Sequence, residues 1–307
     1  MKSGFHGNLK CILVGYFGSV LCFNLAFQFM GFIQGLIPLI STTKCDLIIS
    51  PFYYRIGCIT GSLLMTLPTF FPISITIERF LATRTAKDYE RKPVILGPIL
   101  TILVILIDFI LVALIYKDEE FVAGSISFVF LPAGVAPKMF SCFWMMLILN
   151  VINFFANGFL LRENSILKKL VARKSTSSTL AARYQLEEVY LSTRFAISVI
   201  FVHVIFFGTY VSLTILSRYY GGLLIDDPIT LSAARGALMT MIATYNLIIG
   251  VVAVYLYKMI RTKKAVEINR KVQMKSTGKA GARNYDNAIF KIWNSTSSFS
   301  SRPTPVA

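Results

Sequence analysis

The pair Glu78-Arg79 stands directly after a long apolar run, where a carboxylate and a guanidinium can form an ion pair at the edge of a low-dielectric region. Such a pair can hold the arginine in one conformation of a protein and release it to a partner in another. The plainer interpretation is two charges that flank a membrane helix at the interface. The sharper hypothesis is that Glu78 and Arg79 form a conformational switch.

Few other ionisable residues fall inside apolar runs, where a charge is costly and marks a functional site by default. Asp108 and His203 are two of them; at ~1.5 Å per residue they lie at different depths, so we do not expect a shared proton relay. Asn150, Asn153 and Asn157 form a polar stripe at helical spacing. Hydrogen bonds between packed helices are the favoured interpretation of these residues, and contact with a ligand is the alternative.

Three of the five cysteines, Cys45, Cys58 and Cys142, are expected near the outer surface. A Cys58–Cys142 disulfide would tie two helices together; a Cys45–Cys142 disulfide and three unpaired thiols are the alternatives. The cysteines form no Cys-x-x-Cys pair and the chain has only two histidines, so we expect no metal site. We also expect no cofactor and no catalytic centre.

Membrane-spanning helices must position these residues. The 307-residue chain is 55% hydrophobic and 15% charged, and its apolar residues gather in runs near the ~20 residues that cross a bilayer. Backbone groups in lipid have to pair within their own segment, so the spans should be α-helices. Six spans are predicted: Cys11–Ile40, Phe52–Ile77, Val94–Tyr116, Met139–Leu161, Phe195–Leu216 and Gly236–Tyr257. The segment Phe121–Pro137 is apolar but contains Gly and Pro, which predicts an outer loop rather than a seventh span.

Two regions follow from this pattern: a transmembrane helix bundle over residues 1–257 and a cytoplasmic tail over 258–307. The tail begins with a basic amphipathic segment that we expect to lie on an anionic inner leaflet. Lys174–Thr179 and the tail after Ser276 are rich in Ser and Thr. Phosphorylation there would add negative charge that recruits basic partners, so a kinase and an arrestin are expected at the tail.

The distribution of positive charge sets the orientation. With the N-terminus in the cytoplasm, 25 of the 31 Lys and Arg residues fall on the cytoplasmic side and 6 on the outer side. Six spans then place both termini of this chain in the cytoplasm. The same topology accounts for the net charge of +16, so we do not expect a nucleic acid as a partner.

Three strings in the sequence occur together in one family of receptors: Phe5-His-Gly-Asn-Leu-Lys10, Glu78-Arg-Phe-Leu-Ala-Thr83 followed by Asp88-Tyr-Glu90, and Arg183-Tyr-Gln-Leu-Glu-Glu188. The set resembles nematode serpentine chemoreceptors of class alpha/beta (Srab) and class alpha (Sra), the alpha/beta branch more closely. The resemblance implies an all-α integral membrane protein with the rhodopsin-like serpentine bundle of seven helices.

In that family the Phe-His-x-Asn-Leu-Lys string resembles the first intracellular loop. The resemblance therefore implies that this chain lacks helix one and that its six spans correspond to helices two to seven. It also places Glu78 and Arg79 at the inner end of the third helix, where such receptors couple to G proteins.

We therefore expect a G-protein-coupled chemosensory receptor of the plasma or sensory-cilium membrane that binds a small external molecule between its helices. Its expected partners are a heterotrimeric G protein, a small-molecule ligand and lipids of the anionic inner leaflet. The alternatives are a six-helix transporter or channel and a truncated receptor that does not signal. Few intramembrane charges and no internal repeat count against a transporter.

Overall fold

The computed structural model describes residues 5–85, 93–122, 125–128, 130–173, 180–272, 283, 285–287 and 289–290. Six helices of membrane-spanning length occur among these residues: α1 (Gly7–Ile40), α2 (Pro51–Arg84), α3 (Leu96–Tyr116), α4 (Val135–Arg173), α5 (Leu180–Leu224) and α6 (Pro228–Val272). A short 3-10 helix, η1 (Lys44–Leu47), lies between α1 and α2. The predicted all-α membrane protein with six spans is confirmed.

The chain divides into two compact units, Met1–Tyr257 and Lys258–Ala307. In the second unit, residues 258–272 are helical and continue α6. Lys174–Thr179, which we expected to be a phosphorylation segment, and most of the tail after Val272 lie outside the described residues. The placement of the basic segment along a membrane stays a prediction.

Five of the six helices extend beyond their predicted spans, because the prediction stopped at the first charged residues. Once a helix leaves the bilayer, its charged side chains can be satisfied by water or by an ion pair. No proline or glycine ends these five helices at their predicted span ends. Arg84 at the end of α2 pairs with Glu163 of α4 at 3.3 Å, and Lys168 of α4 pairs with Glu187 of α5 at 2.5 Å. Charged residues therefore continue the helices and join their ends.

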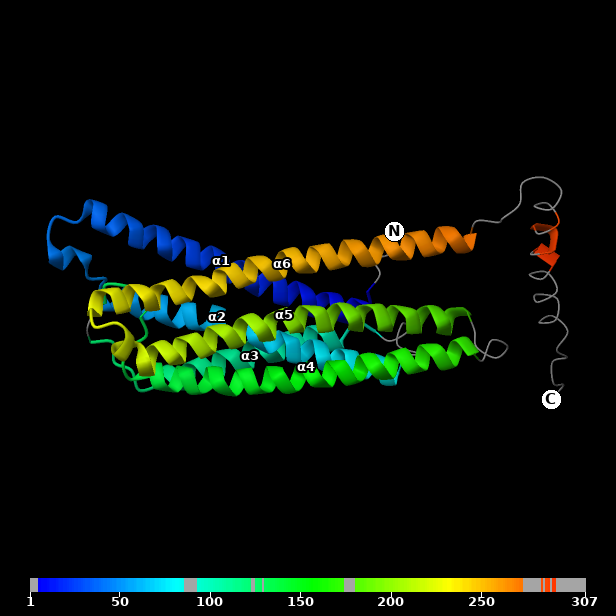
Figure 1. The fold of residues 1–307 in the computed structure, drawn as a ribbon, viewed down its shortest axis with the longest axis horizontal. Helices are drawn as coiled ribbons and strands as arrows, with labels where there is room; N and C mark the ends of the chain where they lie inside the picture. Colours follow the sequence, from blue (N-terminus) through cyan, green and yellow to red (C-terminus); the bar gives the residue numbers. More distant parts are fainter. Residues whose placement is uncertain are drawn as a thin grey trace, which may run out of the picture. The chain divides into compact units, whose positions relative to one another are not determined.

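The helix α2 holds the central position in the bundle of residues 1–257. It contacts α1, α3, α4 and α5, and α4 packs along α5 (Figure 1). Buried apolar side chains such as Ile12, Ile75 and Ile200 fill the interior, whereas large apolar side chains such as Ile99 and Phe155 are exposed. Exposed apolar surface of this kind suits a bundle surrounded by lipid.

Two prolines, Pro68 and Pro72, lie inside α2, and the helix continues through both. Each lacks the N–H that would bond the carbonyl four residues earlier, so the carbonyls of Leu64 and Pro68 lose their helical donor. Asn150 of α4 donates to the Thr69 carbonyl at 3.0 Å, and Thr76 donates to the Pro72 carbonyl at 2.9 Å. Polar side chains thus add hydrogen bonds to other carbonyls of α2 beside its two prolines.

Candidate ligand cavity and arginine switch

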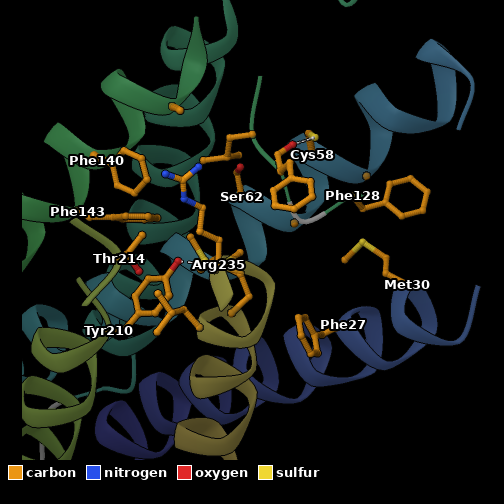
Figure 2. Close-up of a pocket in the computed structure, with 18 of the residues that line it drawn as sticks. Phe27, Met30, Cys58, Ser62, Phe128, Phe140, Phe143, Tyr210, Thr214 and Arg235 are labelled. Atoms are coloured by element: carbon orange, nitrogen blue, oxygen red, sulfur yellow. Dashed lines mark hydrogen bonds between the residues drawn. The ribbon is translucent and has the colours of Figure 1, made fainter. Parts of the chain in front are cut away.

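A cavity of about 550 Å³ lies toward the end of the bundle away from Glu78. Its volume falls in the range of ~300–1,000 Å³ that is typical of small-molecule sites. Five helices contribute to its wall, and Figure 2 shows their side chains converging on one space. Most of the wall is apolar, with aromatic rings from Phe23, Phe27, Phe128, Phe130, Phe140, Phe143 and Tyr210.

Two arginines, Arg218 of α5 and Arg235 of α6, stand among the few polar groups on the cavity wall. The Arg218 guanidinium lies 5.0 Å from the centre of the Phe140 ring, in cation–π geometry. Arg235 donates a hydrogen bond to the Ser217 carbonyl at 3.3 Å. Both arginines therefore bring charge to a wall that is otherwise mainly apolar.

None of the described residues between α3 and Val135 is helical, so the predicted loop Phe121–Pro137 is confirmed for them, whereas its last three residues belong to α4. Its side chains Phe128, Phe130 and Leu131 line the cavity. The loop is fastened at its start, because Lys138 pairs with Asp118 at 2.9 Å. That hydrogen bond and the ammonium charge hold the pKa of the Asp118 carboxyl below its usual range.

Hydrogen bonds from α2 and the residue before it fix the middle of this loop. The Ile49 N–H donates to the Ser125 carbonyl at 2.9 Å, and the Tyr54 hydroxyl donates to the Phe130 carbonyl at 2.5 Å. Gly57 of α2 lies against the Phe128 ring so closely that a Cβ at residue 57 would collide with it. A side chain at position 57 would therefore force the Phe128 ring or the loop that carries it to shift.

A chain of three buried polar side chains lies deeper in the bundle than the cavity. The Tyr245 hydroxyl of α6 hydrogen-bonds Nδ1 of His203 in α5 and lies 3.3 Å from the Tyr16 hydroxyl of α1. A small pocket of about 10 Å³ beside His203 shares Phe23 and Met65 with the cavity wall. Tyr245 therefore joins α1, α5 and α6, at a level deeper in the bundle than the main cavity.

Asp108 of α3 accepts a hydrogen bond from the Thr66 hydroxyl of α2 at 2.5 Å. The carboxyl side chain is almost fully buried and does not line the cavity. Its geometry is that of a packing hydrogen bond between helices, the interpretation favoured for it from sequence.

The asparagine stripe of α4 faces α2. Asn150 bonds the Thr69 carbonyl, as described above, and Asn157 donates to the Thr76 hydroxyl and to the Asn153 carbonyl, the latter at 2.9 Å. Asn150, Asn153 and Asn157 are all buried, and none of them lines the cavity. Their geometry also matches helix packing.

Glu78 and Arg79 form a buried ion pair at the opposite end of the bundle, with side-chain exposures of 0% and 2%. Two guanidinium nitrogens of Arg79 donate to the two Glu78 carboxylate oxygens, each at 2.5 Å. Another guanidinium nitrogen donates to the Ser192 hydroxyl of α5. Arg79 thus connects α2 to α5, roughly 20 Å along α2 from Met65 in the cavity wall at ~1.5 Å per residue.

All five cysteines are free thiols in the structure. The disulfide considered between Cys58 and Cys142, or between Cys45 and Cys142, is therefore not formed. Cys58 and Cys142 are both buried, and the Cys58 thiol lies 3.9 Å from the Phe130 carbonyl.

Comparisons with known proteins agree with this architecture. The sequence model of the family described as serpentine type 7TM GPCR chemoreceptor Srb matches residues 1–207. The chain is 57% identical to serpentine receptor class beta-7 of Caenorhabditis elegans, over 97% of this chain and 84% of that relative. It is 51% identical to serpentine receptor class beta-15 of the same organism, over 96% of this chain and 86% of that relative. The chain belongs to the class beta serpentine receptors.

The resemblance to nematode serpentine chemoreceptors is thereby confirmed, and the matching class is beta, where the sequence motifs suggested alpha/beta or alpha. A serpentine receptor of class beta is a multi-pass membrane protein, as the six apolar helices of the described residues also indicate. No solved structure matches the chain.

Sequence reasoning found the Glu78-Arg79 pair of this class beta receptor but missed its partner Ser192, since one serine in α5 carries no distinguishing pattern. It also missed the cavity residues. Arg218 and Arg235 were counted as outer charges only. Their position near the ends of two consecutive spans was the one signal in the sequence that could have marked them.

Proposed function

We propose that this class beta serpentine receptor is a G-protein-coupled chemosensory receptor, which binds a small external molecule in the cavity and signals to a heterotrimeric G protein. The charge distribution supports an orientation with the Glu78 end and both termini of this chain in the cytoplasm, where Lys and Arg are concentrated. The cavity then faces the outside. The resemblance makes α2 the third helix of the serpentine bundle.

The observation that carries the proposal is the placement of Arg79, buried between Glu78 of α2 and Ser192 of α5. Breaking a buried, hydrogen-bonded ion pair is costly, so this arrangement defines one stable state of the cytoplasmic end. A second state, in which α5 moves away from α2, removes the Ser192 contact and leaves Arg79 accessible to a G protein.

The helix α5 connects the two ends of the receptor. It carries Ser192 at the cytoplasmic end and Tyr210 and Arg218 on the cavity wall, and it is continuous from Leu180 to Leu224. A ligand that binds more tightly when α5 is displaced favours the second state by the ratio of its two affinities. Since His203 of α5 is bonded to Tyr245 of α6, we expect α6 to follow.

A cell assay of ligand-evoked G-protein signalling tests the proposal. External small molecules are screened on cells that express the full chain, and active molecules are re-tested on Arg79→Ala. We expect signalling to be abolished in Arg79→Ala with surface expression unchanged. Arg84→Ala is the matched control, because Arg84 is an exposed cation at the same end that pairs with Glu163 rather than Ser192. Normal signalling by Arg79→Ala would refute the switch.

The proposed partners beyond the G protein act at the same side of the membrane. Anionic lipids of the inner leaflet would bind the basic residues that follow Tyr257, and a kinase and an arrestin would act on the tail.

A further inference from the structure

The outer part of the cavity wall carries two positive charges on neighbouring helices. Arg218 is exposed and lies over the Phe140 ring, and Arg235 is half-buried and bonds the Ser217 carbonyl; both line the cavity. Figure 2 shows Arg235 among the aromatic side chains of the cavity. A guanidinium that only needed water would extend outward from the bundle, whereas the Arg235 side chain is half-buried.

Within the described residues, neither Arg218 nor Arg235 has a carboxylate within 4.0 Å. None of the residues that line the cavity is acidic. The nearby Asp227 is engaged at the start of α6, where it accepts hydrogen bonds from the Thr230 N–H at 2.9 Å and from the Ile229 N–H at 3.3 Å. The cavity therefore carries a net positive charge that no side chain on its wall neutralises.

A guanidinium carries five N–H donors in a planar fork that matches a carboxylate. One hydrogen bond to a carbonyl, as Arg235 makes, uses a small part of this capacity. Next to apolar walls, a charge-assisted hydrogen bond is stronger than in water. An anion seated between Arg218 and Arg235 would thus complete the coordination of both arginines.

The rest of the cavity is suited to an apolar body. Phe23 and Met65, which also line the small pocket beside His203, form its inner wall. Phe23 and Gln34 lie roughly 16 Å apart along α1 at ~1.5 Å per residue. Apolar surface buried there stabilises a ligand by ~25 cal/mol per Å². The space thus has a charged outer part and an apolar inner part.

We propose that the cavity takes an organic acid, whose carboxylate is held by Arg235 and Arg218 and whose apolar chain or ring reaches Phe23 and Met65. This inference rests on the proposed function, in which the cavity is the ligand site of the receptor. An anionic lipid headgroup offers similar chemistry from the outer leaflet, and the experiment separates the two sources.

The test measures binding of radiolabelled decanoate to the full chain in nanodiscs of phosphatidylcholine, with empty nanodiscs subtracted. Decan-1-ol, which has the same chain and no charge, serves as the competitor. The variants are Arg235→Gln, which removes the charge, Arg235→Lys, which keeps it, and Arg55→Gln as the control. Arg55 is an exposed cation on the same side that lies over Phe121 and does not line the cavity.

We expect saturable decanoate binding that is at least tenfold weaker in Arg235→Gln, intermediate in Arg235→Lys and unchanged in Arg55→Gln. Decan-1-ol should compete at least tenfold less well than unlabelled decanoate. The absence of saturable binding, equal competition by the alcohol, or an Arg235→Gln variant that binds like wild type overturns the inference. If Arg235→Gln does not fold, the competition between decanoate and decan-1-ol on the wild-type chain tests the inference instead.

A second series replaces part of the phosphatidylcholine with phosphatidylglycerol. Decanoate binding that stays constant supports an external acid, whereas an Arg235-dependent loss assigns the anion site to a lipid headgroup and overturns the external acid. Two further outcomes distinguish a failure of the proposed function from a failure of the organic-acid inference. Decanoate that binds but evokes no G-protein response counts against signalling alone, and receptor activation by neutral molecules but not by acids counts against the organic acid alone.

Discussion

Arg79 of α2 donates a hydrogen bond to Ser192 of α5 while its other guanidinium nitrogens hold both carboxylate oxygens of Glu78. The Glu78 contact lies within one helix and survives any movement between helices. The Ser192 contact crosses from α2 to α5, so a movement of α5 away from α2 would break it. Arg79 is thus held by two hydrogen bonds within α2 and by one that crosses to α5.

Tyr245→Phe removes the single hydroxyl that joins His203 of α5 to Tyr16 of α1. Because both partners are buried, we expect a loss of ~1–3 kcal/mol in the free energy of unfolding. Unfolding in mixed micelles with increasing SDS measures it. Tyr255→Phe, at an exposed tyrosine of the same helix, should leave the stability unchanged; equal stability of the two variants would show that the chain of hydroxyls contributes nothing.

Asn150→Leu tests the support that α4 gives to the proline-containing part of α2. The variant keeps the side-chain volume but leaves the Thr69 carbonyl without its donor from α4. We expect a destabilisation of ~0.6–2 kcal/mol in the same unfolding assay, the range known for hydrogen bonds between membrane helices. Ile152→Leu, at an exposed position of α4, is the control, and a stable Asn150→Leu would contradict the packing role.

Gly57→Ala tests the contact between α2 and the loop that lines the cavity. A methyl group at residue 57 collides with the Phe128 ring, whereas one at Gly61 of the same helix meets only a Met30 methyl at 3.9 Å. We expect Gly57→Ala to lower the stability by ~1–3 kcal/mol and Gly61→Ala to leave it equal or higher. In a double-mutant cycle, Gly57→Ala should no longer lower the stability when it is made in the Phe128→Ala variant. If Phe128→Ala does not relieve the effect of Gly57→Ala, the clash is not its cause.

The helices could be predicted from the sequence because each crossing of a bilayer requires a run of apolar residues. The helix α3 matches its predicted span within two residues at either end. Helix ends were harder to predict. Five of the twelve residues of α4 beyond Leu161 are charged, which ended the predicted span. The helix continues there, and its Glu163 and Lys168 form ion pairs with α2 and α5.

The cavity was not predictable for a different physical reason. Phe23 and Phe27 line it while Phe29 and Phe32 of the same helix are exposed, and nothing in their residue type separates the two pairs. Only the packing of α1 against the other helices decides which face is interior. The Glu78-Arg79 pair was found because a charge after an apolar run stands out, and Ser192 was missed because a serine in a long helix does not.

Ligand-independent nucleotide exchange measures the central claim most directly, since it requires no known ligand. The full chain is placed in nanodiscs with a purified heterotrimeric G protein, as wild type, Ser192→Ala, Ser198→Ala and Ser192→Ala with Arg79→Ala. Ser198 is the control, because its hydroxyl bonds only the Arg194 carbonyl of its own helix. We predict a several-fold rise in exchange for Ser192→Ala, none for Ser198→Ala, and a return to background when Arg79 is also removed. Exchange in Ser192→Ala no higher than in wild type, or undiminished in the double variant, would contradict the proposal that Arg79 is the switch.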